Sequence, residues 1–427
     1  MLIGDEGGDE GGESFEAAGA AAGGCFQGGR NEDALPDNFV RGRDASDIAT
    51  GARARRTWRR SRRVVHGSAR LALLALRAVA RYLRDSPIRF GKPTLLRIAR
   101  NWLAPAARRS SEVVRLADAP AAQMRCFGVG GAPRPNIINE WLLYTGRWQP
   151  ALTRWLCATL QPGDVFVDVG ANSGYFALLA AARGCRVVAV EACPTTFEAL
   201  RANLAIGPLG TRVRAVQLAA GEAAGRVTLY QHRNEPLYNT TVAGAGAGGV
   251  AAVTDVWAVL QKSAALDAAA ASAVSALAAE RACWREVQVP QASIDDVLAG
   301  DERAPRVVKI DVEGAEWAVL RGMESILRQN DAPIEIVVEL SPKWLKLQSK
   351  SARALLEYMN ERGFHAYALP ADDYEIARCH DAPPTAPPRP RRLHAAEAER
   401  LDAAADGVQL DVIFSRRDAE WLEKSLD

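Results

Sequence analysis

The segment VFVDVGANSGYF, residues Val165–Phe176, constrains the fold of this chain more than any other part of the sequence. Three valines and a phenylalanine surround one acid, a composition typical of a strand buried on both faces of a parallel sheet. A tight glycine turn and a helical pattern follow. Glycines let backbone and ligand approach closely, and a helix start presents N–H groups without intrahelical partners. The segment therefore predicts a site for a nucleotide-like cofactor at the end of a strand.

The spacing of this turn differs from that of the dinucleotide-binding loop. The fingerprint G-x-G-x-x-G has its second glycine where this chain has Asn172. The pattern D-x-G-x-N-x-G, from Asp168 to Gly174, resembles instead the S-adenosylmethionine loop of class I methyltransferases. A nicotinamide-dependent oxidoreductase is the nearest rival among enzymes, and Asn172 disfavours it.

A second motif, VVKIDVEGAE at Val307–Glu316, is again a short β-branched strand that runs into acids, a glycine and a helical pattern. In a doubly wound sheet the carboxyl ends of the strands gather along one edge. Asp168 and Asp311 are therefore expected to face one cleft despite their separation in sequence.

In this order, the two motifs resemble the FkbM family of S-adenosylmethionine-dependent O-methyltransferases. The resemblance covers roughly residues 140–416 and is carried by GRWQP at 146–150, PGDVFVDVGAN at 162–172 and KIDVEG at 309–314. It implies an α/β enzyme with a Rossmann-like, doubly wound, mostly parallel seven-stranded sheet whose last strand is antiparallel. It also implies S-adenosyl-L-methionine as cofactor and a hydroxyl of a sugar, glycan or secondary metabolite as acceptor.

Strand and helix patterns alternate from Trp148 onward, as expected for a parallel sheet. Pro194 suits the first turn of a helix that runs through Leu204. Further helices are predicted near 174–183 and 350–362. Strands are predicted at about 165–169, 186–191, 212–218, 306–311, 334–340, 364–369 and 408–414.

Composition divides the chain into five parts. Residues 1–50 are acidic and rich in glycine and alanine, and we expect them to be disordered. A basic, partly helical segment spans 51–110, a helical lead-in 111–160, the methyltransferase domain 161–416 and a tail 417–427. Insertions at 242–284 and 380–405 interrupt the domain, either as lids and specificity elements or as disordered loops.

Bulk properties point to a soluble cytoplasmic protein, while a small-molecule or glycan acceptor is what the resemblance implies. The seven cysteines include no C-x-x-C pair, which fits a reducing compartment and argues against structural zinc. Neither a signal peptide nor an apolar run of about 20 residues is present. A net charge of +2 identifies no partner, and nucleic acid is not expected. The basic segment 52–84, with Leu73, Leu76, Val79 and Leu83 at helical spacing, is expected either to touch an anionic membrane surface or to pack on the domain.

Four groups of residues are expected to bind the cofactor. Glu191 ends the second strand, where an acid accepts from both ribose hydroxyls. Asp168 would accept from the methionine ammonium, or cap the following helix. Gly170 and Gly174 give backbone access, while Asn172 bonds the loop to itself or reaches the cofactor's carboxylate. By position, Ala219 and Ala220 would line the adenine.

Methyl transfer to a hydroxyl requires alignment of the acceptor oxygen and removal of its proton. Asp311 and Glu313 are the first choices for proton acceptor, Glu339 is another, and Lys309 would hold one of them in an ion pair. A structural polar cluster is the alternative for all four. A divalent metal on the three acids is chemically feasible, but no compact ligand signature supports it, so no metal site is predicted.

Two further features lie near the expected cleft. His232 is interpreted as a solvated loop residue, and Asn239–Thr241 either lines the cleft or forms a turn. A rival of another class is a non-catalytic, methyltransferase-like scaffold protein, which the acids at 168, 191 and 311 argue against.

Overall fold

The computed structural model describes part of one compact unit, Ser61–Asp427. The residues described are 71–72, 74–83, 94–95, 98–99, 111–127, 137–232, 239–242, 284–300, 303–329, 333–370, 388–403 and 409–417. The predicted disordered extension, the insertion up to residue 283 and the tail beyond 417 lie outside them. Residues 71–72 and 74–83 are helical, and Leu76 and Leu83 are buried in the core of the unit. The part of the basic segment that is described therefore packs on the domain.

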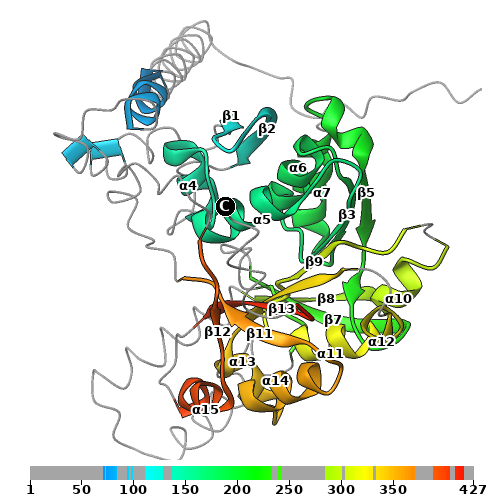
Figure 1. The fold of residues 1–427 in the computed structure, drawn as a ribbon. Coiled ribbons are helices and arrows are strands. Elements are labelled where there is room, and N and C mark those ends of the chain that lie inside the picture. The colour runs from blue at the N-terminus through cyan, green and yellow to red at the C-terminus, as the bar shows by residue number, and fades with distance from the viewer. Residues whose placement is uncertain are drawn as a thin grey trace, which may run out of the picture. The chain divides into compact units, whose positions relative to one another are not determined.

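An eight-stranded sheet forms the centre of this unit (Figure 1). Its order is β12-β11-β13-β10-β9-β3-β4-β5, and β13 runs antiparallel between β10 and β11. The doubly wound, mostly parallel sheet with an antiparallel last strand is thus confirmed, with the short β12 as an additional eighth strand. The strands are β3 (Val165–Val169), β4 (Arg186–Glu191), β5 (Val213–Gln217), β9 (Val307–Ile310), β10 (Glu335–Leu340), β11 (His365–Ala368), β12 (Arg391–Arg392) and β13 (Leu410–Ser415).

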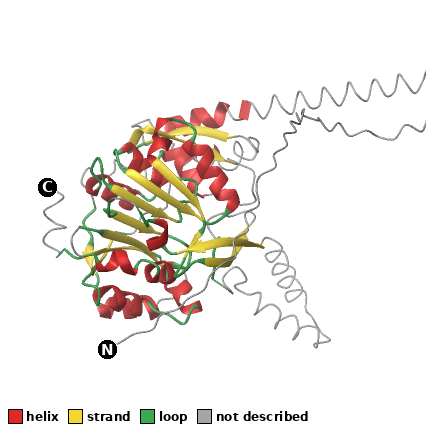
Figure 2. Ribbon diagram, turned by 90° about the vertical axis from the view of Figure 1, so that its right-hand side faces the viewer, coloured by secondary structure: helices red, strands yellow, loops and turns green. Residues whose placement is uncertain are grey.

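Both faces of the sheet are buried. Successive side chains of a strand point to opposite faces, so one strand contributes to two cores. In β3, Phe166 belongs to one core, whereas Val165, Val167 and Val169 belong to the other. Helices cover each face, as Figure 2 shows. The first core contains residues of α4 (Ile137–Thr145), α5 (Pro150–Thr159), α6 (Tyr175–Ala182) and α7 (Pro194–Leu204), and the second contains residues of α10 (Ile294–Val297), α11 (Glu316–Arg321), α12 (Glu324–Arg328), α13 (Pro342–Leu347), α14 (Ala352–Asn360) and α15 (Ala395–Ala403).

Among the helices that the structure describes, none combines the length and the apolar character needed to cross a bilayer. A short 3-10 helix, η2 (Pro208–Arg212), leads into β5.

The prediction of a helical lead-in over 111–160 is wrong in its first part. Residues 111–127 form an antiparallel hairpin of β1 (Ser111–Leu116) and β2 (Ala119–Phe127), which lies against α6 and α7. The reason is a period of two: Ala122, Met124 and Cys126 are buried, while the residues between them are less so. The helices α4 and α5 confirm the prediction for its second part.

A second, three-stranded sheet was not predicted. Strand β8 (Trp284–Ala292) pairs in parallel with β6 (Ala219–Ala220) and antiparallel with β7 (Gly225–His232). Trp284, taken as the end of an insertion, is the first residue of β8. The second insertion, 380–405, likewise contains β12 and α15 rather than only a loop.

Candidate active site

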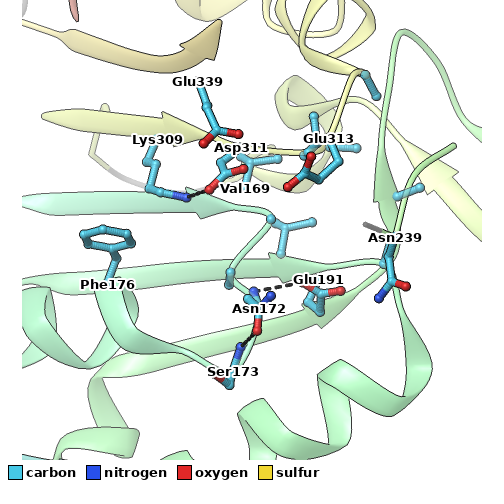
Figure 3. A pocket seen from close by; sticks show the side chains of 18 of the residues that line it. Val169, Asn172, Ser173, Phe176, Glu191, Asn239, Lys309, Asp311, Glu313 and Glu339 are labelled. Carbon is cyan, nitrogen blue, oxygen red and sulfur yellow. Dashed lines mark hydrogen bonds and ion pairs between the residues drawn. The ribbon is translucent and has the colours of Figure 1, made fainter. Parts of the chain in front are cut away.

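A cleft of about 400 Å³ opens at the carboxyl ends of β3, β4, β9 and β10. Figure 3 shows residues of both sequence motifs on its walls: Asn172 and Ser173 of the first, and Lys309, Asp311 and Glu313 of the second. Of the predicted site residues, Gly170, Asn172, Glu191, Ala219, Ala220, Lys309, Asp311, Glu313 and Glu339 line it. Asp168 and Gly174 do not.

The two motifs meet at Gly170. Its φ is 80°, and a Cβ atom there would lie 1.8 Å from the carbonyl oxygen of Asp311. Only glycine fits this approach without displacing backbone. The role of Gly170 is thus to let the loop after β3 lie against the end of β9.

The glycine loop bonds to itself. Asn172 has φ 50°, and its Oδ1 accepts from the Ser173 N–H at 2.7 Å, as one of the two predicted roles requires. Gly174, with φ 95°, is the N-cap that precedes α6, and a Cβ there would lie 2.6 Å from Leu200 Cδ1. Gly174 therefore serves helix packing.

The N–H groups without partners that were predicted for this turn lie a few residues further along the chain. The amides of Gly170 and Ala171 donate to Val190, and that of Gly174 donates to Ala171. The N–H groups of residues 170–174 are therefore all hydrogen-bonded within the protein. In the described chain, the first N–H groups without an acceptor belong to the start of α6, at Tyr175 and Phe176.

Glu191 lies at the end of β4, as predicted, and organises the loop. Its two carboxylate oxygens accept from the N–H of Asn172 at 2.8 Å and of Cys193 at 2.9 Å. Burial raises its pKa to about 7, against the effect of these two bonds. A carboxylate oxygen has more than one lone pair, so Glu191 retains acceptor capacity toward the cleft.

Small side chains form the adjoining wall. Ala219 and Ala220 of β6 are buried beside Leu218 and Leu229, and all four line the cleft. This wall is apolar and includes two small alanine side chains, which leave room for a flat aromatic ring.

Lys309 joins the acids of the two motifs. Its Nζ lies 3.0 Å from Asp311 Oδ2 and 3.8 Å from Asp168 Oδ1, and the side chain is almost completely buried. Burial alone would lower the pKa of Lys309, but the carboxylates of Asp311 and Asp168 reverse this and raise it. Asp168 is itself 1% exposed, and burial raises its pKa to about 6. Asp168 is thus a buried partner of Lys309 below the cleft.

The three predicted proton acceptors come together. Carboxylate oxygens of Asp311, Glu313 and Glu339 lie within 4.8 Å of one another. Burial, and then the charge of Asp311, raises the pKa of both Glu313 and Glu339 well above the usual range. Crowded carboxylates can lower their repulsion by keeping protons or by sharing a hard divalent cation.

A turn, rather than an extended strand, places Glu313. Strand β9 ends at Ile310, and Glu313 has φ 51°. Glu316 holds the turn, because its Oε1 accepts from the N–H of Gly314 at 3.0 Å and of Val312 at 3.2 Å. Burial raises the pKa of Glu316 to about 7.

The polar stretch Asn239–Thr241 lines the cleft with Asn239 and Thr241, one of the two predicted outcomes. Thr240 donates to the carbonyl of Glu313 at 2.6 Å. The interpretation of His232 as a solvated residue is wrong: it is 7% exposed and packs edge-on against Trp284.

Sequence reasoning missed several lining residues, namely Ile138, Trp148, Gln149, Tyr175, Phe176 and Gln409. Trp148 and Gln149 lie in the GRWQP segment, which was used only as a sign of resemblance. The GRWQP segment leads directly into α5, a helix with several buried residues, and this position was the signal that could have placed the segment in the site.

The comparisons with known proteins agree with this geometry. Residues 168–366 match the family described as the methyltransferase FkbM domain. The chain is 45% identical over 75 residues to 31-O-demethyl-FK506 methyltransferase FkbM of Streptomyces tacrolimicus, covering 17% of this chain and 28% of that protein. It is 34% identical over 88 residues to a tRNA1(Val) (adenine(37)-N6)-methyltransferase of Shewanella amazonensis, covering 19% and 37%. The chain thus spans well under half the length of these curated relatives.

Solved structures of methyltransferases are also similar. The methyltransferase FkbM of Methylobacillus flagellatus matches with a TM-score of 0.29 and 16% identity over 71% of this chain and 56% of that chain. A SAM-dependent methyltransferase of Agrobacterium tumefaciens matches with a TM-score of 0.32 and 9% identity over 72% and 71%. The sheet order, the two motifs and the family match lead to one conclusion: residues 168–366 are a methyltransferase domain of the FkbM family, on a class I methyltransferase fold.

Proposed function

We propose that this chain is an S-adenosylmethionine-dependent methyltransferase that methylates a hydroxyl oxygen of a small molecule or glycan. The observation that supports it best is the division of the cleft. One end combines Glu191 with the small residues Ala219 and Ala220, and the other gathers Asp311, Glu313 and Glu339 around Lys309.

The first end suits the adenosine part of the cofactor. Glu191 is fixed by two backbone N–H groups, so an acceptor for ribose hydroxyls is held in place before the ligand binds. The alanines leave room for the adenine ring beside Leu218 and Leu229.

The second end suits the acceptor. The bound cofactor would supply a methyl group activated by a sulfonium. A hydroxyl that attacks this carbon loses its proton as the O–C bond forms and the C–S bond breaks. Glu313 and Glu339 have raised pKa values because they are buried, which makes them stronger bases than ordinary carboxylates and suits them to accept that proton. Lys309 Nζ lies 3.0 Å from Asp311 Oδ2 beside them and orients this carboxylate.

An oxygen acceptor also agrees with the name of the relative from Streptomyces tacrolimicus, which is a 31-O-demethyl-FK506 methyltransferase. The relative from Shewanella amazonensis methylates an adenine nitrogen, so the acceptor atom has to be tested directly.

Calorimetric titration with S-adenosylmethionine and, separately, NADH tests the cofactor. Binding of the first alone is expected. Transfer of a labelled methyl group to a panel of hydroxyl and amino compounds then tests the acceptor, and label on oxygen is expected. Failure to bind S-adenosylmethionine would leave the non-catalytic scaffold as the better reading, and NADH binding would favour an oxidoreductase.

A further inference from the structure

Gln149 has an unexplained side chain in the cleft. It is 3% exposed, it lines the cleft, and its Oε1 has no hydrogen-bond partner. An unpaired buried carboxamide oxygen destabilises the protein, so a ligand group that donates a hydrogen bond to it is expected to bind there.

The Gln149 side chain makes no hydrogen bond to the helix that it precedes. Gln149 is the N-cap of α5, where a side chain usually accepts from the helix, but no such bond forms. Its φ is 39° and Pro150 follows, so the direction of the side chain is set by a constrained backbone.

A hydrogen-bond relay holds Gln149 beside the start of α6. Thr153 Oγ1 donates to the carbonyl of Trp148 at 2.7 Å and lies 3.1 Å from Tyr175 Oη. Tyr175 and Phe176 begin α6 and line the same cleft. In the described chain their N–H groups have no acceptor, because the first helical bond is donated by Leu178 to Gly174.

This wall therefore offers N–H donors next to a carboxamide that both donates and accepts. The other charged side chains that line the cleft are acidic except Lys309, which pairs with Asp311. A carboxylate in the cleft would avoid the acids and find its donors here, where the helix N-terminus favours negative charge.

We infer that Gln149 and the start of α6 bind the α-amino-acid end of S-adenosylmethionine, an inference that rests on the proposed function. The Gln149 carboxamide and the N–H groups of Tyr175 and Phe176 bind the carboxylate, and Gln149 Oε1 accepts from the ammonium. Gln149 precedes the family match at 168–366, so it extends the cofactor site into the lead-in segment.

The test compares two probes by calorimetry: S-adenosylhomocysteine, which has the amino-acid end, and 5′-methylthioadenosine, which lacks it. Gln149→Leu and Gln149→Glu should each weaken binding of the first about tenfold or more, as expected for lost bonds to charged groups. Binding of the second should stay within about twofold, which also shows that the variants fold. Gln288→Leu, on the exposed side of β8, is the matched control.

Equal losses for both probes would make Gln149 a structural residue, and unchanged affinity for S-adenosylhomocysteine would remove it from the site. Either result overturns the inference and leaves the proposed function standing. If the unmodified protein binds neither probe, the proposed function fails and this inference fails with it.

Discussion

The Cα of Gly170 lies so close to Asp311 that a Cβ atom on it would come within 1.8 Å of the Asp311 carbonyl oxygen. The obstacle is backbone of a central strand end, which cannot rotate away as a side chain could. This contact sets the spacing between the cofactor loop and the acids of the second motif.

Gly170→Ala should therefore lower the free energy of unfolding, measured with denaturant, by about 2–4 kcal/mol. This is more than a positive φ alone explains. Gly300→Ala is the matched control, since Gly300 has φ 87° with open space around it. Its cost should be about 1 kcal/mol. Equal costs for the two variants would show that the loop moves aside and that the close approach is not required.

Cofactor binding should depend on the protonation of Glu191. Its pKa is raised to about 7, and only the ionised carboxylate accepts from both N–H groups and from ribose hydroxyls. Affinity for S-adenosylmethionine should fall as pH drops from 8 to 6, toward tenfold per unit below the pKa. Titration at several pH values measures this, and the dependence should disappear in Glu191→Gln. A pH-independent affinity in the unmodified protein would place the ribose elsewhere.

Much of the fold could be predicted because β-branched runs end at glycines or acids. Strands β3 and β4 have the predicted bounds, since Gly170 and Glu191 mark where each one ends. Strand β8 was missed because its residues are mostly exposed or half-buried and its partner β7 lies across the insertion. Its sequence lacks a continuous apolar run.

The site could be predicted where a residue's role follows from its own strand end, as for Glu191 and Asp311. It could not be predicted where a turn or a distant segment determines whether a side chain reaches the cleft. Glu313 reaches the cleft only because its backbone adopts a positive φ, and Gln149 only because the α5 start packs beside α6. Such placements depend on tertiary contacts that no local pattern encodes.

Asp311→Asn should lower turnover and shift the acid limb of the pH–rate profile to lower pH. After burial, the charge of Asp311 is the largest cause that raises the pKa of Glu313 and Glu339. Removing it lets these groups ionise at lower pH, and Lys309 loses its nearest partner. Steady-state rates from pH 5 to 9 measure the shift, with the surface variant Glu222→Gln as control. An acid limb at the same pH in the variant and the unmodified protein would mean that neither glutamate accepts the proton.

Glu339→Gln should lower kcat far more than it lowers affinity for S-adenosylhomocysteine, because Glu339 lies at the acidic end of the cleft, away from the adenosine wall. Removing a general base typically costs about 10²–10⁴-fold in rate. Comparison of kcat with the calorimetric Kd separates the two effects. Equal loss of both would identify Glu339 as a structural member of the acid cluster.

Glu316 should make the ligand-free domain less stable as pH rises from about 4.5 to 7. Its pKa in the folded protein is raised to about 7, so in this window the folded state holds a proton that the unfolded chain has released. Stability rises with pH only where the unfolded state binds more protons, so here the free energy of unfolding must fall. Glu316→Gln removes the titration and keeps the oxygen that accepts from Val312 and Gly314. The variant should match the unmodified protein at pH 4.5 and exceed it at pH 8 by about 1–3 kcal/mol in denaturant unfolding. A variant that is less stable at pH 8 would show instead that the turn needs an ionised carboxylate.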